Sequence, residues 1–229
     1  MASLEGIQLG MNVRNLQGIT WNEGLLAQAH RLCDAARLCS QRGWVPATSG
    51  NFSFRDRASG RILITASGLD KGALSPTDLL EIDADCNSLA GNGKPSAETS
   101  IHGVIYRCQP EARAIFHVHS IWNTLISEHF GDKGGLVLEG YELLKALSGV
   151  STHLHRELVP ILENSQDYAV LSAEVAKVLR NIPHAHGVLL RRHGLYTWGE
   201  SIPGAWRHLE ALEFLFEAES RHLMVPGSW

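Results

Sequence analysis

The chain has 229 residues, of which 44% are hydrophobic, 19% are charged and 7% are aromatic, and its formal net charge at pH 7 is −4. This composition is typical of a globular protein with a buried core and excludes a disordered chain. The acidic balance argues against a surface that neutralises nucleic-acid phosphates, and no apolar run reaches the ~18–20 residues that a membrane-spanning helix needs. We therefore expect neither nucleic acid nor a membrane as a partner.

The chain length and the cysteine and histidine content indicate the number of domains and the class of protein. We expect residues 1–229 to form a single domain, with residues 1–20 as an N-terminal arm. The four cysteines are too widely spaced for C-x-x-C pairs, and the amino terminus lacks the basic and apolar regions of a signal peptide, so we expect reduced thiols in a cytoplasmic protein. The 12 histidines, against 4 tyrosines and 3 methionines, raise the question of a metal site.

Predicted helices and strands alternate along the chain. Apolar residues at helical spacing, with Asn22 and Ser96 as expected N-caps, predict helices over residues 22–43, 96–108, 122–130, 141–149, 166–180 and from 201 to beyond 216. Period-2 alternation and β-rich composition predict strands around residues 52–54, 61–67, 80–83, 112–120 and 187–199. No repeat or linker interrupts this order, which indicates a single α/β layered fold.

Three His-x-His pairs occur in the chain, at His117/His119, His153/His155 and His184/His186. The first pair lies in a predicted strand, where residues i and i+2 point to the same face, so both imidazoles can bind one zinc ion. The other two pairs lie in predicted loops, and we interpret them as solvated histidines.

A catalytic zinc site generally needs a third protein ligand. His193 is the best candidate because it lies in the predicted strand and directly precedes Gly194, whose missing side chain lets a ligand or metal approach closely. A buried structural histidine is the competing interpretation, and spacing alone does not decide between the two.

Two glutamates and two loops complete the candidate site. Glu98 lies in the first turn of a predicted helix, and Glu142 precedes Lys145 at i+3, so either carboxylate has an ordinary alternative as a dipole complement or half of a surface ion pair. The loops TSGN (48–51) and TASG (65–68) combine exposed backbone N–H groups with hydroxyl and amide donors, a mixture that binds phosphate. Ordinary turn chemistry explains these loops equally well.

The segments TSGNFSFR, ILITASG, KPSAETSIH, IFHVHS and RRHGLYTWG occur in an order that resembles the class II aldolase and adducin-related family. The resemblance covers about residues 43–199, and GYELLKAL is similar to the dehydratase members. It implies a three-layer α/β/α domain around a largely antiparallel sheet. It also implies one zinc ion per subunit, held by His117, His119 and His193, and a homo-tetramer with active sites near subunit interfaces.

The resemblance also assigns roles to the other candidates. Glu98 of PSAE matches the acid/base carboxylate of the aldolases, and Glu142 matches the acid/base glutamate of the dehydratases. The phosphate group of the substrate is expected to bind the following residues: Ser49, Gly50, Asn51, Ser67, Gly68 and Lys145.

The activity implied by the resemblance is zinc-dependent dehydration of a small sugar phosphate in methionine salvage. Two alternatives stay open. One is a zinc-dependent aldolase or epimerase that acts on another ketose phosphate, and the other is a non-catalytic adducin-like domain that has lost the metal. Which of Glu98 and Glu142 transfers the proton is also open.

Overall fold

The computed structural model describes residues 14–225, so the first part of the expected N-terminal arm lies outside the described residues. Residues 14–21 correct this expectation, because they form a β-hairpin of β1 (Arg14–Leu16) and β2 (Ile19–Trp21). Its two-residue turn places Gln17 and Gly18 at φ 57° and 82°, which suits a tight hairpin connection. The strands have three residues each, too few for their alternation to be recognised.

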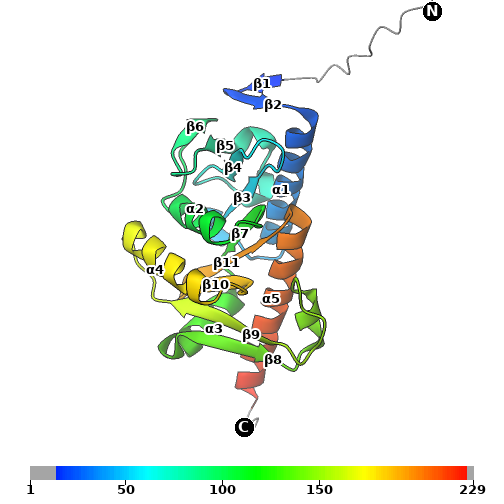
Figure 1. Cartoon of the computed structure of the whole chain (residues 1–229), viewed down its shortest axis with the longest axis vertical. Coiled ribbons are helices and arrows are strands. Elements are labelled where there is room, and N and C mark those ends of the chain that lie inside the picture. The colour runs from blue at the N-terminus through cyan, green and yellow to red at the C-terminus, as the bar shows by residue number, and fades with distance from the viewer. Residues whose placement is uncertain (1–13, 226–229) are drawn as a thin grey trace, which may run out of the picture.

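A nine-stranded sheet forms the centre of the molecule, in the order β6-β5-β4-β3-β7-β11-β10-β9-β8 (Figure 1). Its strands are β3 (Asn51–Arg55), β4 (Ile62–Thr65), β5 (Leu79–Ile82), β6 (Ser88–Ala90), β7 (Ala114–Val118), β8 (Gly135–Glu139), β9 (Arg156–Leu162), β10 (Gly187–Leu190) and β11 (Gly194–Gly199). Only β9 and β10 pair in parallel, and every other pair of neighbours is antiparallel. The expected largely antiparallel sheet is therefore confirmed.

Helices cover both faces of this sheet (Figure 1). They are α1 (Glu23–Gln41), α2 (Thr99–Cys108), α3 (Ile121–Phe130), α4 (Tyr168–Asn181) and α5 (Ile202–Met224). On one face α1, α3 and α5 pack around buried Phe116, and on the other α2 and α4 pack around buried Ile115. Because neighbouring residues of β7 face opposite cores, each strand contributes to both layers. The three-layer α/β/α fold is confirmed.

Several boundaries differ from the sequence predictions. The predicted strand 187–199 is two antiparallel strands, β10 and β11, joined by a turn at residues 191–193 in which Arg192 adopts φ 55°. The predicted helix 141–149 is a short 3-10 helix, η5 (Glu142–Ala146), and strands β8 and β9 on either side of it were not predicted. Their glycine-rich and polar flanks hide the alternation that identifies a strand.

Helix ends were partly predicted. Asn22 caps α1 by accepting a hydrogen bond from the Leu25 N–H at 2.8 Å, and Gly43 follows the helix end with φ 72°, as expected. Ser96 does not cap α2, which begins at Thr99 with Glu98 at the N-cap position and no side-chain cap bond. The Glu98 side chain contacts Asn51 and His193 instead.

Two further sequence expectations concern the whole chain. All four cysteines are free thiols, as expected. Between residues 14 and 225, none of the helices has both the length and the apolar character that crossing a membrane requires.

Candidate metal centre and active site

Three histidines and one glutamate lie close together at one end of the central strands β7 and β11. His117 lies in β7, His119 follows this strand directly, and His193 ends the turn between β10 and β11. Together with Glu98 they offer four ligand atoms that all lie within 4.8 Å of one another. The Nε2 atoms of His117 and His119 are 2.8 Å apart, and His193 Nε2 lies 3.0 Å from Glu98 Oε1. His193 therefore joins the pair, although it does so from a turn rather than from the predicted strand.

Hydrogen bonds at the far side of two rings orient these histidines. The Nδ1–H of His117 donates to the carbonyl oxygen of Leu195 at 3.0 Å, and the Nδ1–H of His193 donates to Asn164 Oδ1 at 3.0 Å. With Nδ1 carrying the proton, Nε2 presents a lone pair to the cluster, which is how metal-binding histidines are usually held. Asn164 was not predicted, because its link to His193 spans 29 residues that include helix α4 and strand β10.

Two glycines allow this close packing. A Cβ atom on Gly194 would lie 2.4 Å from the carbonyl oxygen of Val118, 2.9 Å from His117 Cε1 and 3.2 Å from His119 Cδ2. Gly50 has φ 74°, and a Cβ atom there would lie 2.6 Å from the carbonyl oxygen of His117. Any side chain at either position would displace the histidines, so the predicted role of Gly194 in close approach is confirmed.

Burial keeps His117 and His119 neutral. Desolvation, reinforced by the neighbouring rings, lowers the pKa of His117 well below its ordinary value and lowers the pKa of His119 to about 4. Burial opposes ionisation of Glu98, but its contact with His193 and the nearby rings of His117 and His119 hold its pKa well below the usual range. Three imidazoles beside a carboxylate form a donor set that fits a divalent metal such as zinc.

A buried hydrogen-bond chain runs from Glu98 into the core between the sheet and α2. Asn51 Nδ2 donates to Glu98 Oε2 at 2.6 Å, and Asn51 Oδ1 accepts from His102 Nε2 at 2.5 Å. His102 Nδ1 then accepts from the Ser53 hydroxyl at 2.8 Å, and Ser53 accepts from the Tyr106 hydroxyl at 2.9 Å. Burial lowers the pKa of His102 to about 3, so the ring is neutral and the direction of the chain is fixed.

This chain of donors, the Glu98 relay, explains how Glu98 is held. Because the Asn51 carbonyl oxygen accepts from His102, the amide nitrogen is the atom that faces Glu98 and donates to it. We predicted Asn51 as a phosphate ligand and did not identify His102, Ser53 or Tyr106. His102 and Tyr106 lie at i and i+4 on α2, and that spacing was the one signal that could have indicated them.

A pocket of about 240 Å³ adjoins the metal cluster. Its lining includes all five loop residues predicted to bind phosphate, together with Glu98 and His119: the loop residues are Ser49, Gly50, Asn51, Ser67 and Gly68. The Ser49 hydroxyl is buried and has no hydrogen-bond partner among residues 14–225, so it is available to a ligand oxygen. Tyr168, at the start of α4, also lines the pocket and was not predicted.

A buried lysine lies under this pocket. Lys71 is 1% exposed, and its Nζ donates to the carbonyl oxygens of Thr48 at 2.9 Å and Leu69 at 2.7 Å. Thr48 belongs to the first phosphate loop and Leu69 follows the second, so Lys71 fixes the two loops together and places a positive charge beneath them. Burial lowers the pKa of Lys71, and the nearby carboxylates of Asp70 and Glu98 oppose this.

The structure does not bring Glu142 or Lys145 to the metal cluster of the same chain. The two side chains form an exposed pair with a 2.5 Å contact on η5, where Glu142 is 72% and Lys145 is 45% exposed. This pairing and the charge of His153 lower the pKa of Glu142. Their predicted roles in proton transfer and phosphate binding therefore depend on contacts beyond a single chain.

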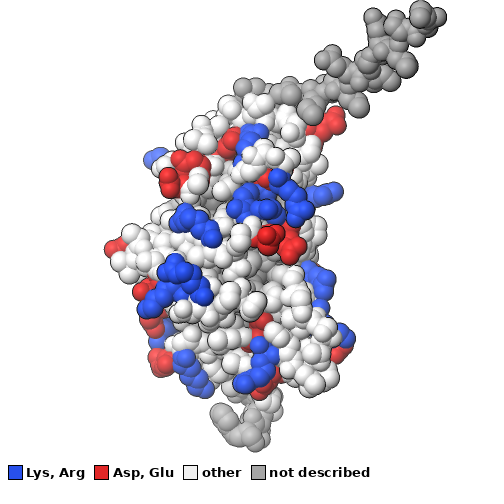
Figure 2. Space-filling view, viewed as in Figure 1, with Lys and Arg blue, Asp and Glu red and all other residues white. Residues whose placement is uncertain are grey.

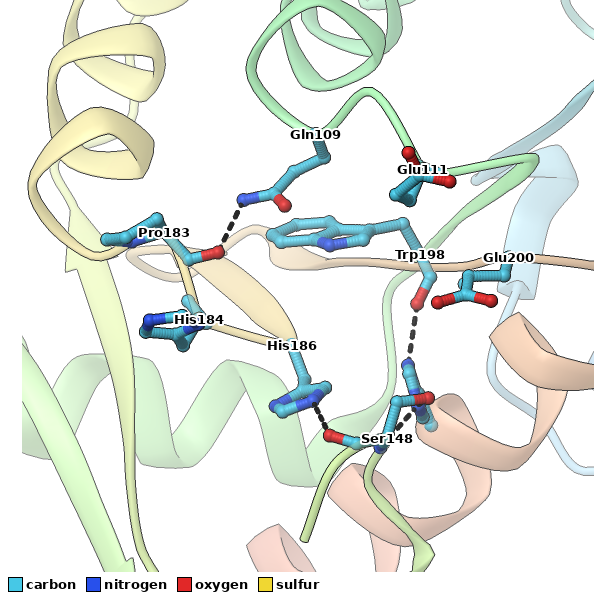
Figure 3. Close-up of a pocket in the computed structure, with 12 residues that line it drawn as sticks. Gln109, Glu111, Ser148, Pro183, His184, His186, Trp198 and Glu200 are labelled. Atoms are coloured by element: carbon cyan, nitrogen blue, oxygen red, sulfur yellow. Dashed lines mark hydrogen bonds between the residues drawn. The ribbon is translucent and has the colours of Figure 1, made fainter.

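Of the remaining histidines, His186 corrects our prediction of a solvated loop residue. It lines a second pocket, of about 200 Å³, with Ser148, Trp198 and Glu200 (Figure 3). Its two ring nitrogens donate to Glu157 Oε1 at 3.0 Å and to the carbonyl oxygen of Ser148 at 2.9 Å. Burial opposes a charge on His186, but the bond with Glu157 outweighs this and raises its pKa. None of the residues that line this pocket belongs to the metal cluster.

Comparison with known proteins identifies the family. A family model described as the class II aldolase and adducin N-terminal domain matches residues 30–220. The chain belongs to this family. One similar protein is the methylthioribulose-1-phosphate dehydratase of Methylococcus capsulatus, which is 48% identical over 85% of this chain and 93% of that protein. The dehydratase of the same name from Pseudomonas syringae pv. syringae is 47% identical over 82% of this chain and 91% of that protein.

A solved class II aldolase structure has the same fold. The crystal structure of L-fuculose-1-phosphate aldolase from Thermus thermophilus superposes with a TM-score of 0.69, at 27% identity, over 86% of this chain and 96% of that one. The family resemblance inferred from the motifs is thereby confirmed.

Proposed function

We propose that this chain is a zinc-dependent lyase of methionine salvage that dehydrates 5-methylthioribulose 1-phosphate to 2,3-diketo-5-methylthiopentyl 1-phosphate. One observation carries this proposal: the His117–His119–His193 cluster adjoins a pocket built from both predicted phosphate loops. The relatives named methylthioribulose-1-phosphate dehydratase share most of their length with this chain, which supports the same substrate. We further propose one domain and a cytoplasmic location.

His117, His119 and His193 would hold one zinc ion per subunit through their Nε2 atoms. A bound zinc ion would act as a Lewis acid toward the substrate carbonyl oxygen and stabilise the negative charge that develops there. Imidazole ligands add no negative charge, so the full positive charge of such an ion would remain available. Glu98, fixed by the relay, lies on the side of the cluster that faces the pocket.

The reaction removes a proton from C3 and a hydroxyl group from C4. Either Glu142 or a second group is proposed to accept the C3 proton, and Glu142 is proposed to protonate the departing hydroxyl, which leaves as water. Glu98 is proposed to orient the substrate or tune the metal. Because Glu142 is exposed on its own chain, it would act in the site of a neighbouring copy. Lys145 would accompany it as an additional cation near the phosphate group.

A homo-tetramer is proposed to supply this contact. Apolar side chains lie exposed on the same part of the surface as Glu142, as a subunit interface requires: Val137, Leu143, Leu154 and Leu158 are 40%, 37%, 74% and 38% exposed. Burying them against a second copy would bring Glu142 away from solvent. In this arrangement the pair of Glu142 and Lys145 would lie at a subunit interface.

A second candidate function is aldol cleavage of a ketose phosphate. The position of Glu98 within the cluster favours it, as does the similarity to L-fuculose-1-phosphate aldolase. The two reactions give different products from 5-methylthioribulose 1-phosphate. Mass spectrometry of the products of the zinc-loaded protein should show a single molecule that has lost one water. Two shorter fragments would identify an aldolase, and unchanged substrate would exclude both activities on this sugar.

A further inference from the structure

A second charged pocket lies at the opposite end of the central strands β3, β7 and β11 from the metal cluster. Arg55 ends β3, Arg113 directly precedes β7 and Glu200 directly follows β11, whereas Asn51, His117 and Gly194 mark the other ends of these strands. At ~3.3 Å per residue, the four steps from one end of β3 to the other separate the two ends by about 13 Å. The pocket has a volume of about 200 Å³ and does not share a lining residue with the phosphate pocket.

Four arginines line this pocket, which we call the arginine pocket. They come from α1 and from the strand ends: Arg31, Arg55, Arg57 and Arg113. Figure 2 shows basic side chains gathered on this face beside α1 and the start of α5. The carboxylate of Glu200 also lines the pocket, so positive charges outnumber negative ones four to one among its lining residues.

The four guanidinium groups lack acidic partners within the described residues. Arg55 Nη2 donates only to the backbone carbonyls of Pro110 and Ala112, at 2.6 and 2.8 Å, and Arg113 Nη1 donates to Pro110 at 3.2 Å. The Nε–H groups of both residues are buried without an acceptor. Elsewhere on the chain, arginines such as Arg61 and Arg191 form ion pairs with carboxylates. The arginine pocket is therefore short of negative charge.

Arg55 is held in place while it carries this uncompensated charge. Its guanidinium carbon lies 4.9 Å from the centre of the Tyr106 ring, which fixes its orientation. Burial and the charge of Arg113 lower the pKa of Arg55, and nearby Tyr106 and Glu111 oppose this without cancelling it. Arginine is the residue that best matches phosphate and carboxylate groups, because its planar donors bind two oxygens at once. A cluster of like charges around a cavity indicates an anion that bridges them.

We propose that the arginine pocket binds a small ligand with a diphosphate group. Two linked phosphates carry enough negative charge to balance four guanidinium groups against one carboxylate, which a single phosphate does not. Inorganic pyrophosphate and a nucleoside diphosphate such as ADP share this group. This inference does not depend on the proposed dehydratase activity, because the pocket lies apart from the metal cluster and the phosphate pocket.

The test is titration calorimetry of the zinc-loaded protein with pyrophosphate and, separately, with ADP, at constant ionic strength and with the zinc content measured afterwards. Arg31 and Arg57 are exposed and make no hydrogen bond or ion pair within the described residues, so the double variant Arg31→Gln/Arg57→Gln should fold normally. We expect it to bind the diphosphate group at least about tenfold more weakly than the unaltered chain. Arg180→Gln, which removes an exposed arginine elsewhere, should bind as the unaltered chain does.

Specific results would overturn the proposal. One is equal pyrophosphate binding by the double variant and the unaltered chain, and another is sulfate binding as tightly as pyrophosphate. Loss of pyrophosphate binding in Ser67→Ala would place the ligand in the phosphate pocket instead. A change in oligomeric state of the double variant, measured by light scattering, would make the arginines a contact between copies. If ADP binds and pyrophosphate does not, a nucleoside site rather than a diphosphate site is present.

Discussion

The Nε2 atoms of His117 and His119 lie 2.8 Å apart, with the Nδ1–H of His117 committed to the carbonyl oxygen of Leu195. With the His117 proton on Nδ1, the Nε2–H of a neutral His119 donates to the lone pair of His117 Nε2 at this distance. Zinc bonds of ~2.0–2.1 Å in a tetrahedral site separate two nitrogens by about 3.3 Å, so a small rotation of either ring accommodates the ion. Burial keeps both rings neutral at neutral pH, so a bound cation would take the place of the shared proton once the His119 proton moves to Nδ1.

Two conservative variants distinguish the roles of Glu98 and Glu142. Glu142→Gln keeps the shape of the side chain but removes its titrating group, so we expect single-turnover dehydration to slow about 10²–10⁴-fold with normal zinc content. Glu98→Gln should slow it less. A nearly active Glu142→Gln beside an inactive Glu98→Gln would assign the proton transfer to Glu98.

Mixed oligomers test whether Glu142 acts in a neighbouring subunit. His119→Ala chains and Glu142→Gln chains are each expected to be inactive alone, because each lacks one part of every site. Refolded together in equal amounts, about a quarter of the sites would combine an intact metal cluster with an intact Glu142, so about a quarter of the wild-type activity should return. If mixtures stay inactive while wild-type chains recover under the same conditions, Glu142 does not act across subunits.

The phosphate pocket predicts a selective loss of affinity. Ser67→Ala removes one donor to a charged group, and such hydrogen bonds are worth ~1.5–3 kcal/mol, so substrate binding should weaken about tenfold or more. Zinc content should not change, because Ser67 is not part of the metal cluster. Calorimetry with the phosphorylated and dephosphorylated sugar provides the check. Equal affinity of the unaltered chain for both sugars would rule out the phosphate pocket.

The Glu98 relay predicts a stability cost at His102. In His102→Ala, Asn51 and Ser53 each lose a buried hydrogen bond, so the free energy of unfolding should fall by about 2 kcal/mol or more. His102→Gln, which can still donate and accept, should lose less. The exposed His30→Ala serves as the control and should change stability by less than ~0.5 kcal/mol. Urea titrations measure all three, and equal values for His102→Ala and His30→Ala would contradict the relay.

A buried carboxyl group predicts pH-dependent stability. Burial raises the pKa of Glu213 to about 7, although Ser120 and Asn123 donate to it at 2.5 and 2.9 Å. The unfolded chain loses this proton near pH 4.5, so Glu213 destabilises the fold increasingly as pH rises from 4.5 and fully above 7. Glu213→Gln should therefore gain stability relative to the unaltered chain over this window, by up to about 3 kcal/mol. A difference in unfolding free energy that stays constant from pH 4.5 to 8 would contradict this.

The sequence predicted the parts of the site that depend on local pattern. A strand places His117 and His119 on one side by its period alone, and the glycine at position 194 indicated a close approach before any contact was known. The helix from Asn22 to Gly43 was recognisable because both of its ends carry capping residues. These features need no knowledge of distant parts of the chain.

The parts that were missed depend on tertiary contacts. The sequence places His193 in a continuous strand because the segments on both sides are apolar. Only the pairing of β10 with β11 reveals the turn. Lys71 looks like a surface residue in the sequence, yet the two phosphate loops enclose it. The predicted cap at Ser96 failed because Glu98 makes its contacts with Asn51 and His193, which are far away in the sequence.

The zinc content of purified protein tests the central claim most directly. Elemental analysis should find one zinc ion per chain in the unaltered protein and in His153→Ala, whose side chain is half exposed and outside the metal cluster. The double variant His117→Ala/His119→Ala, with its fold checked by circular dichroism, should contain almost no zinc and should not dehydrate 5-methylthioribulose 1-phosphate. Full zinc occupancy in this double variant would contradict the account.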